Sequence, residues 1–405
     1  MTVIAQTTIP RLFDDGIFSP SVDDHRAVLR ETIGDVMKVY GPSSEREQCF
    51  PRGLTEHLGR AGLVRQRWLQ PLYGDPGRGV LLAEELARSS WIGLSVGVSL
   101  QVETVLSILT RFGNSDLLGE LREACLDGTA LGCFGASELV GGSDLAGVET
   151  TARRTAGGWS VQGEKKYLSL GKVADFALIL CHMDDHGNSR GAASLGVVAV
   201  PREGLRIKRK LRKVGTHALD TSWMVIEADV PDEAVVARPG MGLTVATWGL
   251  THERLAVAAQ TVGACGFALG LATAHLHRRH QFGKALYDHQ ALRLRLADLT
   301  ARLDILRLAV YGAATGVPVA GRCGPREMAG LKVSAARFAE EAMSECLQVL
   351  GGAGYLEDET PLGRMWRDAR LGRLGGGSDE MMWELVAAGM IPDFDSYERA
   401  MDFEA

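Results

Sequence analysis

Apolar residues at helical spacing dominate the first third of the chain. Residues 22–40 carry apolar side chains three and four positions apart, and the breaker pair Gly41-Pro42 follows them, so we expect a helix that ends there. Residues 81–112 are mostly apolar, which predicts a buried helical hairpin that turns around Gly93-Leu94-Ser95. The pattern therefore predicts a helical domain over residues 1–131.

The middle of the chain has a different pattern, which begins near Cys133. Short runs rich in β-branched residues, separated by Gly, Asp and Pro, occupy residues 158–163, 176–180, 195–200 and 223–226, and Pro231 closes the segment. Runs of this length and composition are typical of strands. We expect a small β-sheet or β-barrel domain over residues 132–236.

Long helical patterns return after Gly242. Apolar residues recur at three- and four-residue spacing in four segments, which are 250–278, 289–314, 325–350 and 378–389. Four such helices can bury their apolar faces against one another in a bundle. The expected fold class is α+β, with an N-terminal helical domain, a central β domain and a C-terminal four-helix bundle over residues 237–405.

Composition excludes several kinds of partner. The chain of 405 residues has a formal net charge of -6, so a nucleic-acid partner is not expected. The densest basic stretch, residues 206–213, is interpreted as a solvated strand and turn, with a site for a CoA phosphate as the alternative. Seven scattered cysteines are typical of a reducing cytoplasm. We expect no signal peptide, because the first residues lack a charged start and a long apolar core. We expect no membrane insertion, because Gly, Ser or Glu interrupts the longest apolar runs.

Four stretches in one order carry a resemblance to a known family. Residues 136–144 read ASELVGGSD, residues 279–283 read RHQFG before His289-Gln290, residues 348–352 read QVLGG, and residues 367–370 read RDAR before a GGGS run at 375–378. Together they resemble the motifs of the acyl-CoA dehydrogenase family over nearly the whole chain. The resemblance implies the family's three-part architecture, FAD as cofactor, and FAD-dependent α,β-dehydrogenation of an acyl thioester.

The family's reaction removes a proton α to the thioester carbonyl and passes the β hydrogen, as hydride, to the flavin N5. It needs a carboxylate base in a desolvated pocket and hydrogen-bond donors on the carbonyl oxygen. The commonest position of that base corresponds to Gly376, which has no side chain. The branch that includes isovaleryl-CoA and long-chain acyl-CoA dehydrogenases places the base on an earlier helix, where this chain has Glu253-Arg254. We expect Glu253 to be the base, with an exposed carboxylate or a partner of Arg254 as the alternatives.

The resemblance also implies which residues hold FAD and substrate. Ser137 keeps the hydroxyl and backbone N–H that the family's threonine offers to the flavin edge. Tyr167 replaces a tryptophan and is expected to stack on the flavin, with a packed strand aromatic as the alternative. A guanidinium such as that of Arg279 suits the FAD diphosphate. The expected cofactor-binding residues are Phe134, Ser137, Gly142, Tyr167, Ser169, Arg279, Phe282, Gln290, Gln348, Gly351, Gly352 and Ser378, and the expected substrate-binding residues are Ser143, Arg254, Gly376 and Gly377.

Ser378 also begins the last predicted helix, with Asp379 and Glu380 in its first turn. Ser at a helix N-cap with acidic residues after it is a common start signal, and the backbone N–H groups there suit an anion or a carbonyl. Three histidines, 275, 277 and 280, lie close together on a predicted helix, but no carboxylate or cysteine stands at ligand spacing. We therefore expect no metal site.

Two other functions stay open on the sequence alone. Departures from the family pattern at Gly376, Tyr167 and Leu139-Val140 also suit a flavin oxidase or monooxygenase of the same fold that acts on a natural-product intermediate. A non-catalytic flavin-binding homologue is the further alternative. For the leading function, the resemblance implies an acyl-CoA or acyl-carrier-protein substrate, an electron-transfer flavoprotein as oxidant, and a homotetramer or homodimer.

Overall fold

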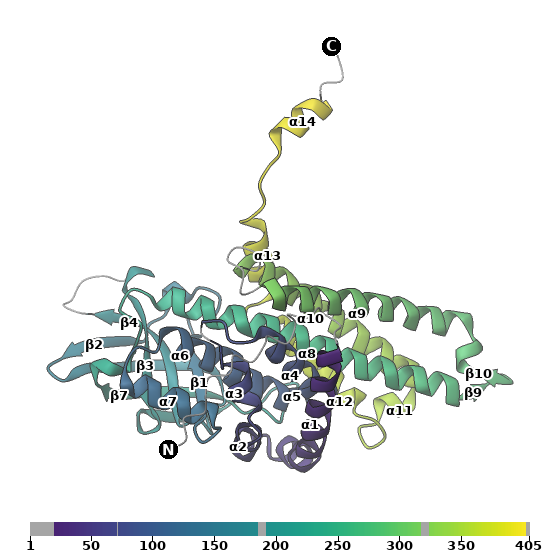
Figure 1. Cartoon of the computed structure of the whole chain (residues 1–405), viewed down its shortest axis with the longest axis horizontal. Helices are drawn as coiled ribbons and strands as arrows, with labels where there is room; N and C mark the ends of the chain where they lie inside the picture. Colours follow the sequence, from purple (N-terminus) through teal and green to yellow (C-terminus); the bar gives the residue numbers. More distant parts are fainter. Residues whose placement is uncertain (1–19, 71, 185–191, 317–323, 402–405) are drawn as a thin grey trace.

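The computed structural model describes residues 20–401, apart from residue 71 and the segments 185–191 and 317–323. Helices precede and follow one large sheet, so the structure confirms the expected α+β class (Figure 1). The sheet lies at one end of the molecule beside the N-terminal helices, and the long C-terminal helices extend to the opposite end. This arrangement places the middle of those helices near the other two parts of the chain.

The N-terminal part is helical, as predicted. Its helices are α1 (Pro20–Glu47), α2 (Arg52–Arg60), α3 (Leu63–Arg67), α4 (Pro76–Arg88), α5 (Ile92–Ser99), α6 (Leu106–Phe112) and α7 (Asp116–Leu126), with a π-helical turn, η1 (Leu100–Val105), between α5 and α6. A π-helical turn offsets the faces of the helix on either side of it. The turn η1 packs against a long C-terminal helix and supplies one residue of the candidate site.

Two predicted breaks in these helices are wrong. Gly41-Pro42 lies inside α1 and Gly93 lies inside α5, whereas the chain turns at Ser90, whose φ is 70°. A Cβ on Gly41 would lie 2.2 Å from the indole of Trp91, and a Cβ on Gly93 would lie 3.2 Å from the backbone of Thr216. Both glycines therefore allow a neighbour to approach closely and do not reverse the chain.

The central part is an open sheet of eight strands. They are β1 (Gly132–Gly135), β2 (Thr151–Thr155), β3 (Gly158–Ser169), β4 (Phe176–Asp184), β5 (Leu195–Pro201), β6 (Leu205–Lys210), β7 (Thr221–Val230) and β8 (Val235–Val236). The order is β6-β7-β3-β2-β4-β5-β8, with β1 parallel to β4. In the described part of the chain no pairing joins β6 to β8, so the barrel alternative is wrong. The edge strand β6 is exposed after Leu205, as expected for a solvated basic strand.

The four C-terminal helices are present, but the last one is short. They are α8 (Gly242–Arg278), α9 (Gln290–Gly316), α10 (Pro325–Leu350) and α13 (Asp379–Ala387). Shorter elements complete this part: β9 (His280–Gln281), β10 (Lys284–Ala285), α11 (Gly352–Tyr355), α12 (Leu362–Ala369) and α14 (Phe394–Met401).

Helix α8 packs against α9, α10 and the N-terminal helix α4. A Cβ on Gly263 of α8 would lie 1.9 Å from the carbonyl oxygen of Glu84 of α4. The glycine therefore allows the two helix backbones to touch. This close contact fixes α8, which carries the candidate base, against the N-terminal part.

Two apolar stretches in the described chain, Ile92–Phe112 and Gly242–Arg278, are long enough to cross a membrane. Their most apolar windows are 89% and 72% buried inside the protein. Buried core helices have this composition when other elements surround them on all sides. Packing within the fold is therefore a sufficient reason for both stretches.

Candidate active site

A glycine turn leads into α13 at the centre of the candidate site. Gly376 and Gly377 have φ values of 67° and 107°, a region that disfavours residues with a Cβ. The carbonyl oxygen of Gly376 accepts a hydrogen bond from Arg254 Nε at 3.0 Å, and that of Gly377 accepts one from Lys332 Nζ. Two buried cations, one on α8 and one on α10, therefore hold consecutive carbonyl groups of the turn.

Glu253 faces this turn from α8. Its side chain is half-buried, and Oε2 accepts a hydrogen bond from Thr104 Oγ1 of η1 at 3.0 Å. A Cβ built on Gly376 would lie 3.3 Å from Glu253 Oε1. The carboxylate therefore lies beside the place where a side chain at position 376 would begin. Positions 253 and 376, the two places where the resemblance puts a base, therefore lie side by side, and in this chain the carboxylate comes from Glu253 on α8.

The surroundings of Glu253 favour a base. Burial raises the pKa of Glu253 above its usual value, while the hydrogen bond from Thr104 and the charges of Arg254 and Lys332 act in the opposite direction without cancelling it. A carboxylate with a raised pKa holds a proton more tightly, which favours its use as a base toward a weakly acidic C–H group. Among the described contacts Glu253 is neither fully exposed nor ion-paired with Arg254, so neither alternative for it describes the observed geometry.

The close approach of Gly376 to Glu253 predicts a strong effect of Gly376→Ala. The new methyl group would meet Glu253 Oε1 at 3.3 Å and would sit on a backbone with a φ of 67°. We expect flavin reduction by substrate to slow by about tenfold or more because the base is displaced, with a stability loss of only about 1–2 kcal/mol. The matched control is Gly375→Ala, whose Cβ would meet Leu371 at an ordinary 3.6 Å. Equal reduction rates for the two variants would contradict the assignment.

The loop expected at the flavin edge is fixed by a buried ion pair. Glu138 accepts hydrogen bonds from Lys165 Nζ at 2.6 Å, from Thr150 Oγ1 at 2.6 Å and from the backbone N–H groups of Glu149 and Thr150. Ser137 is bound through its carbonyl oxygen, which accepts from the N–H of Lys166 at 2.9 Å. The segment that follows is exposed, including Leu139, Val140, Gly142 and Ser143. The ion pair therefore anchors a loop whose tip is open to a ligand.

Tyr167 lies exposed on β3. Its ring is 60% exposed and its φ is 64°, at an irregularity in the pairing of β3 with β7. Lys166 Nζ lies 4.9 Å from the ring centroid. An exposed aromatic ring on a strained backbone is not a packed strand residue, so that alternative is wrong. Ser169 lies two positions further on β3, paired with Thr221, and Phe134 lies on β1 beside Leu178.

The remaining predicted cofactor residues lie at the far end of the C-terminal helices. Arg279 and Phe282 are in the β9–β10 hairpin segment, and Phe282 is 92% exposed. Gln290 begins α9, while Gln348, Gly351 and Gly352 lie at the end of α10 and are exposed. Figure 1 shows this hairpin at the opposite end of the long helices from α13. Within a single chain, these predicted cofactor residues therefore form a group at the helix ends that is separate from the glycine turn before α13.

Several features of the site were not predicted from the sequence. Thr104 donates to Glu253 and Lys332 donates to the carbonyl of Gly377, while the Glu138–Lys165 pair fixes the loop next to Ser137. Lys332 could have been singled out from the sequence, because it occupies a position of α10 whose helical spacing matches that of the buried apolar residues. Ser378 is the N-cap residue of α13, as predicted, but its side chain makes no capping hydrogen bond. In the part of the chain that the structure describes, no group of three histidine, cysteine or acidic residues could hold a metal.

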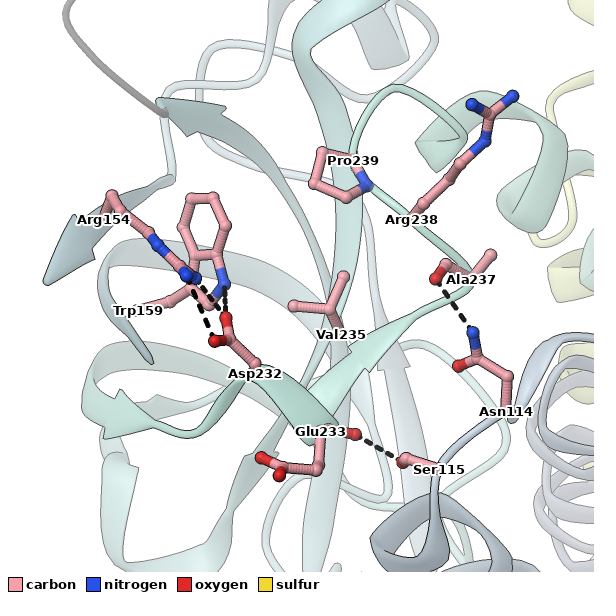
Figure 2. Close-up of a pocket in the computed structure, with 10 residues that line it drawn as sticks. All are labelled: Asn114, Ser115, Arg154, Trp159, Asp232, Glu233, Val235, Ala237, Arg238 and Pro239. Carbon is pink, nitrogen blue, oxygen red and sulfur yellow. Dashed lines mark hydrogen bonds and ion pairs between the residues drawn. The ribbon is translucent and has the colours of Figure 1, made fainter. Parts of the chain in front are cut away.

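A separate polar hollow of about 480 Å³ lies between α7 and the β8 end of the sheet (Figure 2). Asp232 closes one side of it through hydrogen bonds with Arg154 and with Trp159 Nε1, the latter at 2.9 Å. Asn114 and Ser115 of the neighbouring segment bond to backbone carbonyls on the other side. None of the predicted site residues lines it, so the hollow is distinct from the candidate active site.

Comparison with known proteins identifies the family. The acyl-CoA dehydrogenase middle domain matches residues 133–228, and the acyl-CoA dehydrogenase C-terminal domain matches residues 240–391. The chain belongs to the acyl-CoA dehydrogenase family. It is 44% identical over 382 residues to the acyl-[acyl-carrier-protein] dehydrogenase MbtN of Mycobacterium sp. (strain MCS), a match that covers 94% of this chain and 97% of that protein.

Solved structures of the same fold agree with this identification. Butyryl-CoA dehydrogenase from Megasphaera elsdenii matches with a TM-score of 0.83 and 26% identity, over 92% of this chain and 98% of that one. The FAD complex of PigA shares the fold at 21% identity, with a TM-score of 0.83 over 92% of this chain and 97% of that one. Like its family, this acyl-CoA dehydrogenase homologue is an FAD-dependent oxidoreductase.

The chain's own residues fit the cofactor. The exposed ring of Tyr167 offers a planar apolar surface beside the open loop at Ser137, which suits an isoalloxazine. The exposed guanidinium of Arg279 and the exposed ring of Phe282 offer a diphosphate contact and an aromatic contact.

Proposed function

We propose that this protein is an FAD-dependent dehydrogenase that removes the α proton and the β hydrogen of an acyl group held as a thioester on a carrier protein, with Glu253 as the base. The observation that carries the proposal is the Glu253 carboxylate beside the side-chain-free Gly376 turn. The 44% identity to an acyl-[acyl-carrier-protein] dehydrogenase over nearly the full length supports the carrier protein over CoA.

In the proposed reaction, Glu253 Oε1 takes the α proton, and Thr104 holds the other carboxylate oxygen in place. Bound FAD supplies the hydride acceptor. A peptide N–H points away from its own C=O, so tying the carbonyls of Gly376 and Gly377 to cations turns the N–H groups of Gly377 and Ser378 to the opposite side. These N–H groups are positioned as donors to the thioester carbonyl oxygen, where negative charge develops as the proton leaves.

The carrier part of the proposal predicts a preference between two forms of one substrate. With the same acyl group, we expect kcat/KM to be at least about tenfold higher for the carrier-protein thioester than for the CoA thioester, equal to about 1.4 kcal/mol of transition-state binding. A dye-coupled assay under nitrogen measures both, and the unacylated carrier protein is the control. Equal values would assign the substrate to CoA, and substrate-coupled oxygen uptake without dye would favour the oxidase or monooxygenase alternative.

The predicted FAD-binding residues at the ends of the long helices require a second copy of the chain. We propose that a second copy in a homodimer or homotetramer completes the FAD site with the exposed group at the helix ends, which comprises Arg279, Phe282, Gln290, Gln348, Gly351 and Gly352. An electron-transfer flavoprotein is the proposed oxidant of the reduced cofactor. The described cysteines are free thiols, which supports a reducing cytoplasmic location.

A further inference from the structure

Lys332 is an unusual residue for the place where it lies. It is 0% exposed and sits in the middle of α10 among buried apolar residues such as Met328, Val333 and Ala336. A buried ammonium is costly unless a partner stabilises it. Its described hydrogen bond goes from Nζ to the carbonyl oxygen of Gly377, in the turn that faces Glu253.

Four charged groups from three elements surround this ammonium. Asp379 begins α13, Arg373 precedes the glycine turn, and Glu253 and Arg254 face it from α8. Asp379 accepts a hydrogen bond from Arg373 Nε at 2.7 Å, whereas Lys332 bonds to Gly377. Lys332 therefore holds the turn that the candidate base faces and adds positive charge beside that base.

We propose that Lys332 is a positioning residue for the reaction: it holds the Gly376–Gly377 turn in front of Glu253 and places a buried positive charge on the far side of that turn. The inference rests on the proposed role of Glu253. Arg254 holds the neighbouring carbonyl of the same turn through Nε at 3.0 Å, so the two cations share the fixing of the backbone. Lys332 is buried within α10, and the proposed role involves no contact with the substrate.

The charges also set the direction of the pH effects. Burial lowers the pKa of Lys332 to about 8, against the opposing attraction of Asp379 and Glu253. The lysine is therefore mainly protonated below that pH and carries its positive charge there. Its charge lowers the pKa of Glu253 and so opposes the effect of burial on that group. Removing the charge should raise the pKa of Glu253 further.

Three substitutions separate the charge from the hydrogen bond. Lys332→Met removes both, Lys332→Gln keeps a donor without the charge, and Lys332→Arg keeps the charge. The readout is the protonation of Glu253 in the FAD-loaded protein, followed through its carboxyl C=O stretch in the infrared, which is assigned by its loss in Glu253→Gln. This measurement needs no substrate, so it does not depend on which acyl group the enzyme takes.

We expect the midpoint of the Glu253 titration to rise by about one pH unit in the Met and Gln variants and to stay near the wild-type value in the Arg variant. Unchanged midpoints in both neutral variants would overturn the role of the charge and leave Lys332 as a structural partner of Asp379 and Gly377. If the Met variant does not fold, the Gln variant, which is close in size to lysine, decides. Failure of the proposed function is distinguishable, because Glu253→Gln would then still reduce its flavin with substrate whatever the Lys332 variants show.

Discussion

Replacing Glu253 by glutamine should lower the rate of flavin reduction by substrate at least about 10²–10⁴-fold, the usual contribution of a positioned general base. Glutamine keeps the shape and can still accept the hydrogen bond from Thr104, but it cannot take a proton at neutral pH. Position 376, where most of the family has its base, is glycine and offers no carboxylate in its place. The effect should fall on the chemical step, with substrate binding and flavin content close to wild type.

The matched control for this variant is Glu384→Gln on α13. Glu384 is exposed on the helix that follows the turn. Its substitution by glutamine removes one negative charge, as Glu253→Gln does, but at the surface. We expect it to reduce its flavin at the wild-type rate. Rapid mixing under nitrogen, followed by the fall in flavin absorbance, measures both variants. A Glu253→Gln protein that matches Glu384→Gln in rate would show that the base lies elsewhere or that the reaction does not begin with proton abstraction.

The second large effect concerns stability. Lys165→Met should lower the free energy of unfolding by about 3–5 kcal/mol, because it leaves the Glu138 carboxylate buried without its cation. Lys165 is 0% exposed and also donates to the carbonyl oxygen of Ala136 at 3.1 Å. The same variant should loosen the loop at Ser137 and bind FAD more weakly. Urea unfolding of the flavin-free protein isolates the stability term from the effect of the cofactor.

The double variant Glu138→Gln/Lys165→Met is the control for this prediction. The glutamine introduced there would keep a neutral acceptor for the backbone N–H groups that bind Glu138, so most of the lost stability should return. Burial by itself would raise the pKa of Glu138, but Lys165 and the hydrogen bonds from Thr150 and Glu149 together outweigh it, and the pKa is lowered. In the wild type this contribution is present above the unfolded-state pKa and is lost as the pH falls through the folded value. In Lys165→Met burial acts on Glu138 without the opposing cation, so the deficit should grow as the pH rises and Glu138 ionises in the unfolded state. A deficit that is independent of pH and remains in the double variant would mean lost packing, not a buried charge.

Much of the fold could be predicted from residue patterns, and the failures share a cause. The helical, β and helical order follows from the change in apolar periodicity near Cys133 and Gly242. The breaks predicted at Gly41-Pro42 and Gly93 were wrong because glycine occurs both at turns and at close contacts. Only the spatial neighbours, Trp91 and Thr216, show that these two glycines belong to close contacts. The packing of α4 on α8 was also not predicted, because this contact joins two segments that lie far apart in the sequence.

The candidate site was predictable where chemistry leaves a mark on the sequence. A glycine at 376 combined with a glutamate at 253 indicates a base on the earlier helix, and the structure brings those two positions together. Thr104 could not be found this way, because a π-helical turn decides which face of η1 meets α8 and no residue in it announces that turn. The group at Arg279 and Phe282 shows the other limit, because it follows α8 at the β9–β10 hairpin, which lies at the opposite end of the long helices from α13.

The most direct test of the central claim uses the purified FAD-loaded enzyme under nitrogen with carrier proteins that bear short, branched, medium and long acyl groups. For the class that bleaches the flavin, the same acyl group deuterated at the α carbon is then compared with the undeuterated one in a single turnover. We expect slower bleaching with the deuterated group in the wild type and no bleaching at a comparable rate in Glu253→Gln. Equal rates for the two isotopes, or wild-type bleaching in the variant, would contradict α-proton abstraction by Glu253.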